Sequence, residues 1–305
     1  MLRATPIREL TVETGDGPDA VAAASGLVRA GAHVYVIADD RLELAAFGAE
    51  CGAPGRLRRM LPGELPEDPA ERKLAKPDLE ALALLPGAAG AAGPGGALLA
   101  LGSGSRDNRR RGVVWRLAAT GALEGDPQPV DLAPLYTELE RAIPDLNVEG
   151  AAVRGGELLL FQRGNGAAGV NAAIALDLAA ARADLAAGTM RPEAITGIRH
   201  YDLGTTGGVR LAFSDAAPLP DGRIVYSAVA EAGDDTFHDG ECVGAGIGVI
   251  EAGGALGRFE ALEPASKVEG VEARAHGRAI DLLMVADPDD PDAVAELLGA
   301  RVYPQ

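Results

Sequence analysis

The sequence predicts an all-β fold, a five-bladed β-propeller with a central channel. One short pattern recurs five times: a polar residue opens an apolar run, a tight turn follows, and a strongly apolar strand comes next. The recurring polar position returns at intervals of about 55 to 70 residues, a length that suits a four-stranded blade, and is occupied by Ser25, Glu80, Glu149, Asp215 and Glu269. Chance pairing in an alanine- and glutamate-rich chain is the alternative, but similar turn positions in five places favour a true repeat. Five repeats account for the chain, so we expect residues 1–305 to form a single domain.

The composition limits the partners of the chain. The net charge of −17 argues against a nucleic-acid or anionic-membrane partner, because either needs a basic surface, and it favours cation binding. The first 17 residues lack the apolar core of a secretion signal, so we expect a cytoplasmic protein. The apolar stretch 79–104 is interrupted by Pro86 and Pro94, which indicates two strands and a loop rather than a transmembrane helix. Cys51 and Cys242 match neither a metal site nor a disulfide framework, and we expect both to be reduced.

The elements of the first two repeats follow from apolar segments between turn residues. Residues 6–12 precede the first ring residue, so we place them as the outermost strand of the last blade, beside the C-terminal segment. The other strands expected here begin near Ala24 and Leu82 or span 34–38, 42–47, 98–101 and 112–117. The charged, proline-rich segment 56–76 is expected to contain a helical turn, and 106–111 to form a basic loop.

The last three repeats contain both strands and helical patterns. Expected strands are 149–153, 157–162, 172–177, 223–229, 246–251, 280–286 and a last one at 302–303, with 209–213 leading into the fourth repeat. Apolar spacing predicts helices over 132–142, 178–187 and 292–298, the second ending near Gly188. The fifth repeat begins at Ser266.

The ring residues carry the functional hypothesis, because the innermost strand of every blade lines one channel. Three glutamates and an aspartate facing one another at about 5 Å, with an effective dielectric constant of about 20, repel by roughly 3 kcal/mol per pair. An all-oxygen site of carboxylates and a serine hydroxyl suits a hard cation, and a five-fold ring favours Ca2+ over octahedral Mg2+. The alternative is a polar plug of waters and partly protonated carboxyls without a metal.

Three motifs suggest a family. Asp39-Asp40-Arg41 follows the first inner strand, Phe213-Ser214-Asp215 opens the fourth repeat, and Lys267-Val268-Glu269-Gly270 opens the fifth. With the ring order, they make the chain resemble the calcium-dependent apyrases, five-bladed propellers that bind calcium in the central channel and hydrolyse nucleoside di- and triphosphates. The resemblance implies that Ser25, Glu80, Glu149, Asp215 and Glu269 hold the ion, although Asp215 stands where that family tends to have serine. Phytase-like esterase propellers and calcium lactonases are similar at this level.

Residues of the channel mouth are the candidates for chemistry. Asp39 and Asp40 would orient a water or hold substrate-bound metal, and Arg41 and Arg163 would clamp a phosphate through paired hydrogen bonds. The resemblance also places Arg163 where the family has a functional arginine. Arg106 and Asn165 lie on equivalent loops and are candidate substrate contacts. Asp-Asp-Arg is also common in solvated turns, and Arg163 could instead pair with Asp202 or Glu231.

Three functions remain open from the sequence. The first is a calcium-dependent hydrolase of phosphoanhydride or phosphoester bonds in a small-molecule substrate. The second is a non-catalytic propeller that keeps a structural calcium ion and serves as a binding module. The third is an esterase or lactonase that uses the ion as a Lewis acid.

Overall fold

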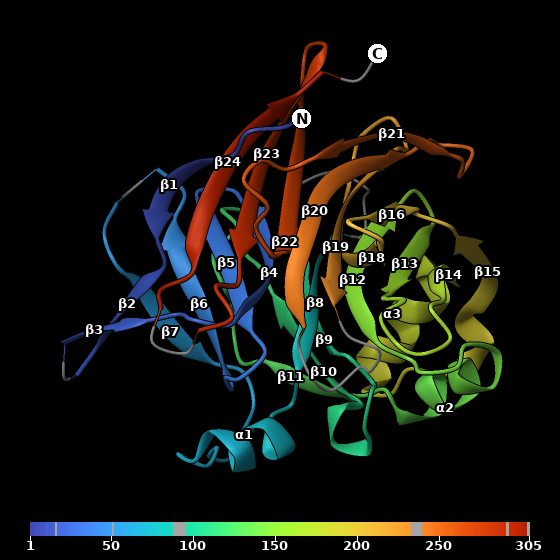
Figure 1. The fold of residues 1–305 in the computed structure, drawn as a ribbon. Helices are drawn as coiled ribbons and strands as arrows, with labels where there is room; N and C mark the ends of the chain where they lie inside the picture. Colours follow the sequence, from blue (N-terminus) through green and yellow to red (C-terminus); the bar gives the residue numbers. More distant parts are fainter. Residues whose placement is uncertain (16, 51, 88–95, 233–239, 291–292, 304–305) are drawn as a thin grey trace.

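Five sheets surround a central axis in the computed structural model, which describes residues 1–15, 17–50, 52–87, 96–232, 240–290 and 293–303 (Figure 1). Each sheet is one blade of a five-bladed β-propeller, which confirms the predicted fold class. The inner strands of the five blades are β4 (Ala24–Ala30), β8 (Leu79–Leu85), β12 (Val148–Arg154), β18 (Ala212–Pro218) and β22 (Val268–His276). Each inner strand contacts the inner strands of both neighbouring blades, and these contacts close a ring around the axis.

The N-terminal segment joins the first and last blades. Strand β1 (Thr5–Glu9) pairs with β24 (Glu296–Val302), so the prediction that this segment is the outermost strand of the last blade is confirmed. The predicted strand 6–12 is divided at Leu10, which is fully buried, and β2 (Thr11–Thr14) continues into the first blade. Because one short segment pairs with both sheets, it holds the ring of blades closed.

The first blade extends its meander with the N-terminal hairpin. Its further strands are β5 (His33–Ala38), β6 (Glu43–Gly48), β7 (Gly55–Arg59), β2 and β3 (Gly17–Ala20), with β2 parallel to β7. The predicted strands at 34–38 and 42–47 are confirmed. The helical turn expected within 56–76 is α1 (Pro69–Ala75), which begins after Asp68, whose carboxylate accepts a hydrogen bond from the Glu71 amide. Cys51 lies outside the described residues.

One of the helices that the apolar spacing predicted follows the second blade, and another lies between the last two strands of the third. Their further strands are β9 (Ala97–Gly102), β10 (Arg111–Arg116), β11 (Gln128–Asp131), β13 (Glu157–Gln162), β14 (Asn171–Asp177) and β15 (Ile195–Tyr201). Helices α2 (Ala133–Ala142) and α3 (Leu178–Ala187) match the predicted segments, and the short helices η1 (Asp107–Arg109) and η2 (Pro192–Ala194) lie in the loops. Gly188 ends α3 with a φ of 78°, a left-handed conformation that glycine adopts without a steric penalty.

The fourth and fifth blades complete the ring. Their further strands are β19 (Ile224–Ala232), β20 (Glu241–Ile250), β21 (Leu256–Ala261) and β23 (Ala279–Ala286), and β16 (Thr205–Thr206) pairs with β17 (Val209–Arg210) beside them. The helix predicted at 292–298 is wrong, because Glu296–Leu298 belong to β24, the third strand of the last blade; Asp292 lies outside the described residues. Leu297 and Leu298 are buried, and the ladder between β23 and β1 satisfies their backbone groups.

The core lies between neighbouring blades. Phe213 makes edge contacts with Phe161 of the third blade and Tyr226 of the fourth, at ring separations of 5.3 and 5.1 Å. Such interfaces fix the inner strands, and with them the side chains around the axis. No helix in the described parts of the chain combines the length and apolarity needed to span a bilayer.

Candidate functional site

A β-bulge at the start of every inner strand builds the ring. In each blade, two residues of the inner strand oppose one residue of the second strand, and the extra residues are Ser25, Glu80, Glu149, Ser214 and Glu269. A bulge redirects a side chain out of the alternation of the strand. The recurring polar residue of the sequence pattern therefore marks a recurring backbone irregularity.

The fourth ring residue is Ser214, so the prediction of Asp215 is off by one position. The Ser214 hydroxyl donates to the Val268 carbonyl at 2.6 Å, just as Ser25 donates to the Leu79 carbonyl at 2.6 Å, and both acceptors precede the ring residue of the next blade. Asp215 follows the bulge and points between blades, where its Oδ2 accepts a hydrogen bond from the Val271 amide at 2.8 Å. Its carboxyl group does not line the central cavity.

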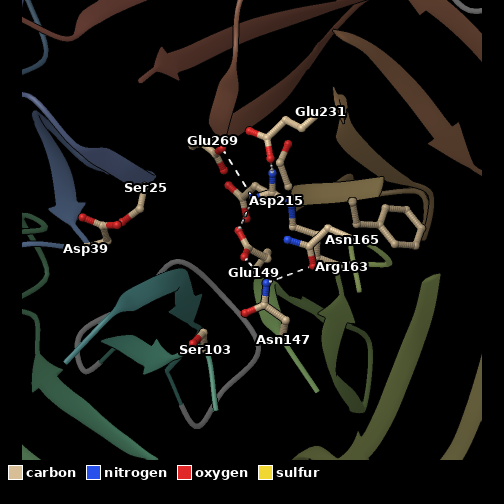
Figure 2. Close-up of polar contacts among 12 residues, drawn as sticks. Ser25, Asp39, Ser103, Asn147, Glu149, Arg163, Asn165, Asp215, Glu231 and Glu269 are labelled. Atoms are coloured by element: carbon tan, nitrogen blue, oxygen red, sulfur yellow. Dashed lines mark hydrogen bonds and ion pairs between the residues drawn. The ribbon is translucent and has the colours of Figure 1, made fainter. Parts of the chain in front are cut away.

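Two further layers of side chains lie above the ring. Two residues before each bulge stand Ala23, Asp78, Asn147, Ala212 and Lys267. In four blades the carbonyl of that residue accepts a hydrogen bond from the residue that follows the second strand, namely Asp39, Ser103, Arg163 or Asp287. The fourth blade differs because β19 is longer, and it contributes Glu231 instead. The site is thus assembled from equivalent positions of the repeat, as Figure 2 shows for part of it.

These layers enclose a small polar cavity on the axis, of about 50 Å3, which we call the acidic pocket. Its lining includes four of the five predicted metal ligands, Ser25, Glu80, Glu149 and Glu269. Among the described residues, six carboxyl groups and five basic side chains line it, and Glu231 contacts two of those bases from the fourth blade. Seven acidic groups therefore face five basic ones in this part of the chain.

Arg163 pairs with the carboxylates on one side of the pocket. Its Nη1 lies 3.1 Å from Glu149 Oε2 and 3.6 Å from Glu269 Oε1, and its Nη2 lies 2.5 Å from Glu231 Oε2. Lys267 lies 3.4 Å from Glu231 and 3.6 Å from Glu269. Figure 2 shows Glu149, Arg163, Glu231 and Glu269 grouped in this way. The pairing with Glu231 was one alternative left open by the sequence, and it means that the repulsion within the ring is partly relieved by the chain itself.

A second network surrounds Asp78. Its carboxylate contacts Arg109 at 2.8 Å, Lys76 at 2.9 Å and the Ser103 hydroxyl at 2.5 Å. Lys76 also pairs with Asp39. Asp78 has a φ of 54°, a strained conformation that aspartate tolerates better than most residues and that is often found at functional sites. The oxygens of Asp39, Asp78 and Glu80 lie within 4.8 Å of one another, close enough to share one cation.

Two glutamates are left without hydrogen bonds. Glu80 has neither a hydrogen bond nor an ion pair with any residue that the structure describes, and both oxygens of the buried Glu269 lack a hydrogen-bond donor in the same set. Burial raises the pKa of Glu80 well above its ordinary value, and the neighbouring carboxylates raise it further. Burial likewise raises the pKa of Glu269 well above its ordinary value, although Arg163 and Lys267 oppose the shift. These oxygens fit a site for a hard cation, which would supply the missing charge.

The predicted mouth residues divide into three groups. Asp39, Arg163 and Asn165 line the acidic pocket. Asp40 and Arg41 line a wider neighbouring cavity of about 800 Å3, the outer cavity, which also includes Asp39, Lys73, Lys76 and Asp287 of the pocket. Arg106 is exposed and lines neither cavity; Arg109 is the buried residue of the basic loop. The two cavities therefore meet at Asp39.

Several site residues escaped the sequence analysis, which followed one position per repeat. Asp78, Asn147 and Lys267 precede the ring residues by two, a spacing that places strand side chains on one side. Reading that second position would have found them. Lys76 follows α1 and Arg109 is the last residue of η1, and no repeat position marks either of them.

Comparison with known proteins finds one matching family and several solved structures of low similarity. Among curated proteins, none matches the sequence. Solved structures that resemble the chain include Myxococcus xanthus glutaminyl cyclase (14% identity, TM-score 0.43, covering 99% of this chain and 97% of the other), a luciferin-regenerating enzyme (11%, 0.42, 98% and 95%) and the WD40 β-propeller domain of Doa1 (9%, 0.37, 98% and 97%). Such low identities carry no functional argument. Residues 20–302 match a family model, and the chain therefore belongs to DUF6929, a family of unknown function.

Proposed function

We propose that the acidic pocket binds one calcium ion and that the chain is a calcium-dependent hydrolase of phosphoanhydride or phosphoester substrates. The observation that carries the proposal is that Glu80 and Glu269 accept no hydrogen bond from the described residues, in a pocket lined by more acidic than basic groups. Ionised carboxylates buried in this way need a cation or a proton.

Calcium fits the donor set better than other metals. Carboxylates, the Ser25 hydroxyl and the Asn147 and Asn165 amides offer oxygen ligands, and no histidine or cysteine lines the pocket among the described residues. Such a set suits hard cations, and calcium accepts irregular sites of six to eight oxygens. The residues that we expect to hold the ion are Glu80, Glu149, Glu269 and Ser25, with Asp39 and Asp78 beside them.

The outer cavity would receive the substrate. Its volume of about 800 Å3 lies within the range of small-molecule sites, and Asp39 belongs to both cavities. The Asp39 carboxylate would accept a hydrogen bond from a water at their boundary, and Lys73, which lines both cavities, would contact an anionic substrate. A bound calcium ion would polarise a phosphoryl oxygen and lower the pKa of a water ligand.

The second candidate is a binding module with a structural ion. It is favoured by the pairing of the two arginines expected to clamp phosphate. Arg41 donates to Asp19 at 2.9 Å and to the Ala20 carbonyl at 2.6 Å, and Arg163 pairs with three glutamates. Both would have to leave these partners to hold a phosphate.

Phosphate release from nucleotides, measured with malachite green on chelator-treated protein with and without added calcium, tests the hydrolase. We expect calcium-dependent release by the wild type and its loss in Glu80→Gln, with Glu138→Gln on the exposed face of α2 as the control. Turnover of p-nitrophenyl esters instead would indicate the esterase. If no substrate is turned over while calcium still raises the melting temperature, the hydrolase is refuted and the structural ion is favoured.

A further inference from the structure

The inner strands line a second cavity, at the end of the channel opposite the acidic pocket. It has a volume of about 310 Å3, and all five inner strands contribute to it at positions two to five residues after the bulge. Its apolar lining is aliphatic, with Leu27, Leu82 and Val271 among the larger side chains. The rim residue Leu84 is 39% exposed. We call this second cavity the aliphatic cavity.

The two cavities are separate sites. They share no lining residue among the residues that the structure describes. Between them, the position after each bulge holds small residues in several blades, and the inner strands approach closely there. A Cβ added to Gly270 would lie 2.9 Å from the Gly26 Cα, and one added to Gly150 would lie 2.9 Å from the Asp215 Cα. We therefore expect binding in the aliphatic cavity to be independent of the acidic pocket.

Among the residues that the structure describes, one basic side chain of the aliphatic cavity has no hydrogen-bond or ion-pair partner. Three charged side chains line it, Arg29, Glu272 and Arg274, and Glu272 pairs with Arg274 at 3.5 Å. The Arg29 guanidinium has no hydrogen bond or ion pair within the described parts of the chain, and its Nε is buried. Burial raises the pKa of the Glu272 carboxyl, and Arg274 and, to a smaller extent, Arg29 oppose this shift. The cavity thus combines an aliphatic wall with a guanidinium that makes no hydrogen bond or ion pair with the described residues.

We propose that the aliphatic cavity binds an amphiphilic monocarboxylate, with its aliphatic body against the inner strands and its carboxylate on Arg29. The guanidinium offers parallel N–H donors in a geometry that matches a carboxylate. The volume lies at the lower end of the range for small-molecule sites, about 300–1,000 Å3. The absence of aromatic residues from the described lining favours an aliphatic over an aromatic ligand.

Calorimetric titration with octanoate and octanamide tests this site, because the two compounds have nearly the same shape and only the first is charged. We expect wild-type protein to bind octanoate at least tenfold more tightly than octanamide. Arg29→Gln should abolish that difference and leave octanamide binding unchanged. Arg141→Gln, which removes an exposed arginine of α2, is the matched control and should behave as wild type.

Leu84→Asp provides a second variant in case Arg29→Gln fails to fold. It adds a negative charge at an exposed rim position and should weaken octanoate binding at least fivefold, with little change for octanamide. Equal binding of the two ligands by wild type, an unchanged preference in either variant, or no binding at millimolar concentration would overturn the proposal. Octanoate binding should not change with chelator, so its outcome is independent of the calcium site.

Discussion

Replacing Arg163 with methionine removes the cation that three buried glutamates share. Glu149, Glu231 and Glu269 have side chains that are 5 to 8% exposed, and they lie 2.5 to 3.6 Å from the guanidinium. Removing one partner of a buried ion pair costs about 3–5 kcal/mol, because the remaining charge is uncompensated. For a chain of this size, 1 kcal/mol corresponds to a melting-temperature change of about 2 °C, so we expect Arg163→Met to melt about 6–10 °C below wild type in chelator at pH 8.

The size of this effect should depend on pH. Burial raises the pKa of Glu149 and Glu269, and Arg163 opposes both shifts, so its removal raises them further. A carboxyl with a raised folded-state pKa stabilises the fold below its unfolded pKa, and this contribution is lost as the pH rises through the folded value. The deficit should therefore be small at pH 5 and largest at pH 8.

Differential scanning fluorimetry measures both effects. Arg141→Met is the control, since its side chain is 72% exposed and pairs with Glu138 on the surface, where removal costs less than about 1 kcal/mol. A melting temperature of Arg163→Met within 2 °C of wild type at pH 8, with folding otherwise intact, would refute the reasoning that Arg163 neutralises the pocket.

Three further changes test neighbouring parts of the account. Burial raises the pKa of Asp215 well above its ordinary value, and the stability that such a group contributes is lost as the pH rises. Asp215→Asn should therefore have a higher melting temperature than wild type at pH 8 but not at pH 4. Equal melting temperatures of variant and wild type at both pH values would contradict this. Gly270→Ala should lower the free energy of urea unfolding by about 1–3 kcal/mol, because the added Cβ meets the backbone of the first blade. Gly197→Ala, which has open space around it, should leave this free energy unchanged. Similar unfolding free energies for the two variants would be evidence against close contact between the inner strands. Lys76→Met removes a cation that competes with calcium for Asp39 and Asp78. Calorimetry should show calcium binding to this variant about tenfold more tightly than to wild type. Weaker binding would show that Lys76 does not compete with the ion.

The fold was accessible from the sequence because the repeat combines a bulge, a tight turn and an apolar strand in every blade. The same regularity located Ser25, Glu80, Glu149 and Glu269. In the fourth repeat, Ser214 and Asp215 are both polar, and a pattern of residue types does not show which one occupies the bulge. The backbone register does, because Asp215 pairs with Ser227 after the irregularity.

The charge balance of the site was not accessible in the same way. The sequence predicts carboxylates on one axis, which an external cation would have to neutralise. Lys76 and Arg109 reach the axis from α1 and η1 and their adjoining loops, whose path depends on tertiary packing. The incorrect prediction of a helix at 292–298 has a related cause. The local spacing of apolar residues is helical, but pairing with β23 makes Glu296–Val302 a strand of the last blade.

Calcium titration of chelator-treated protein by calorimetry tests the central claim most directly. We expect one ion per chain for the wild type, with binding weakened at least tenfold in both Glu80→Gln and Glu269→Gln and unchanged in Glu138→Gln. Wild-type protein that takes up no calcium at millimolar concentration, or both pocket variants binding as tightly as wild type, would contradict it.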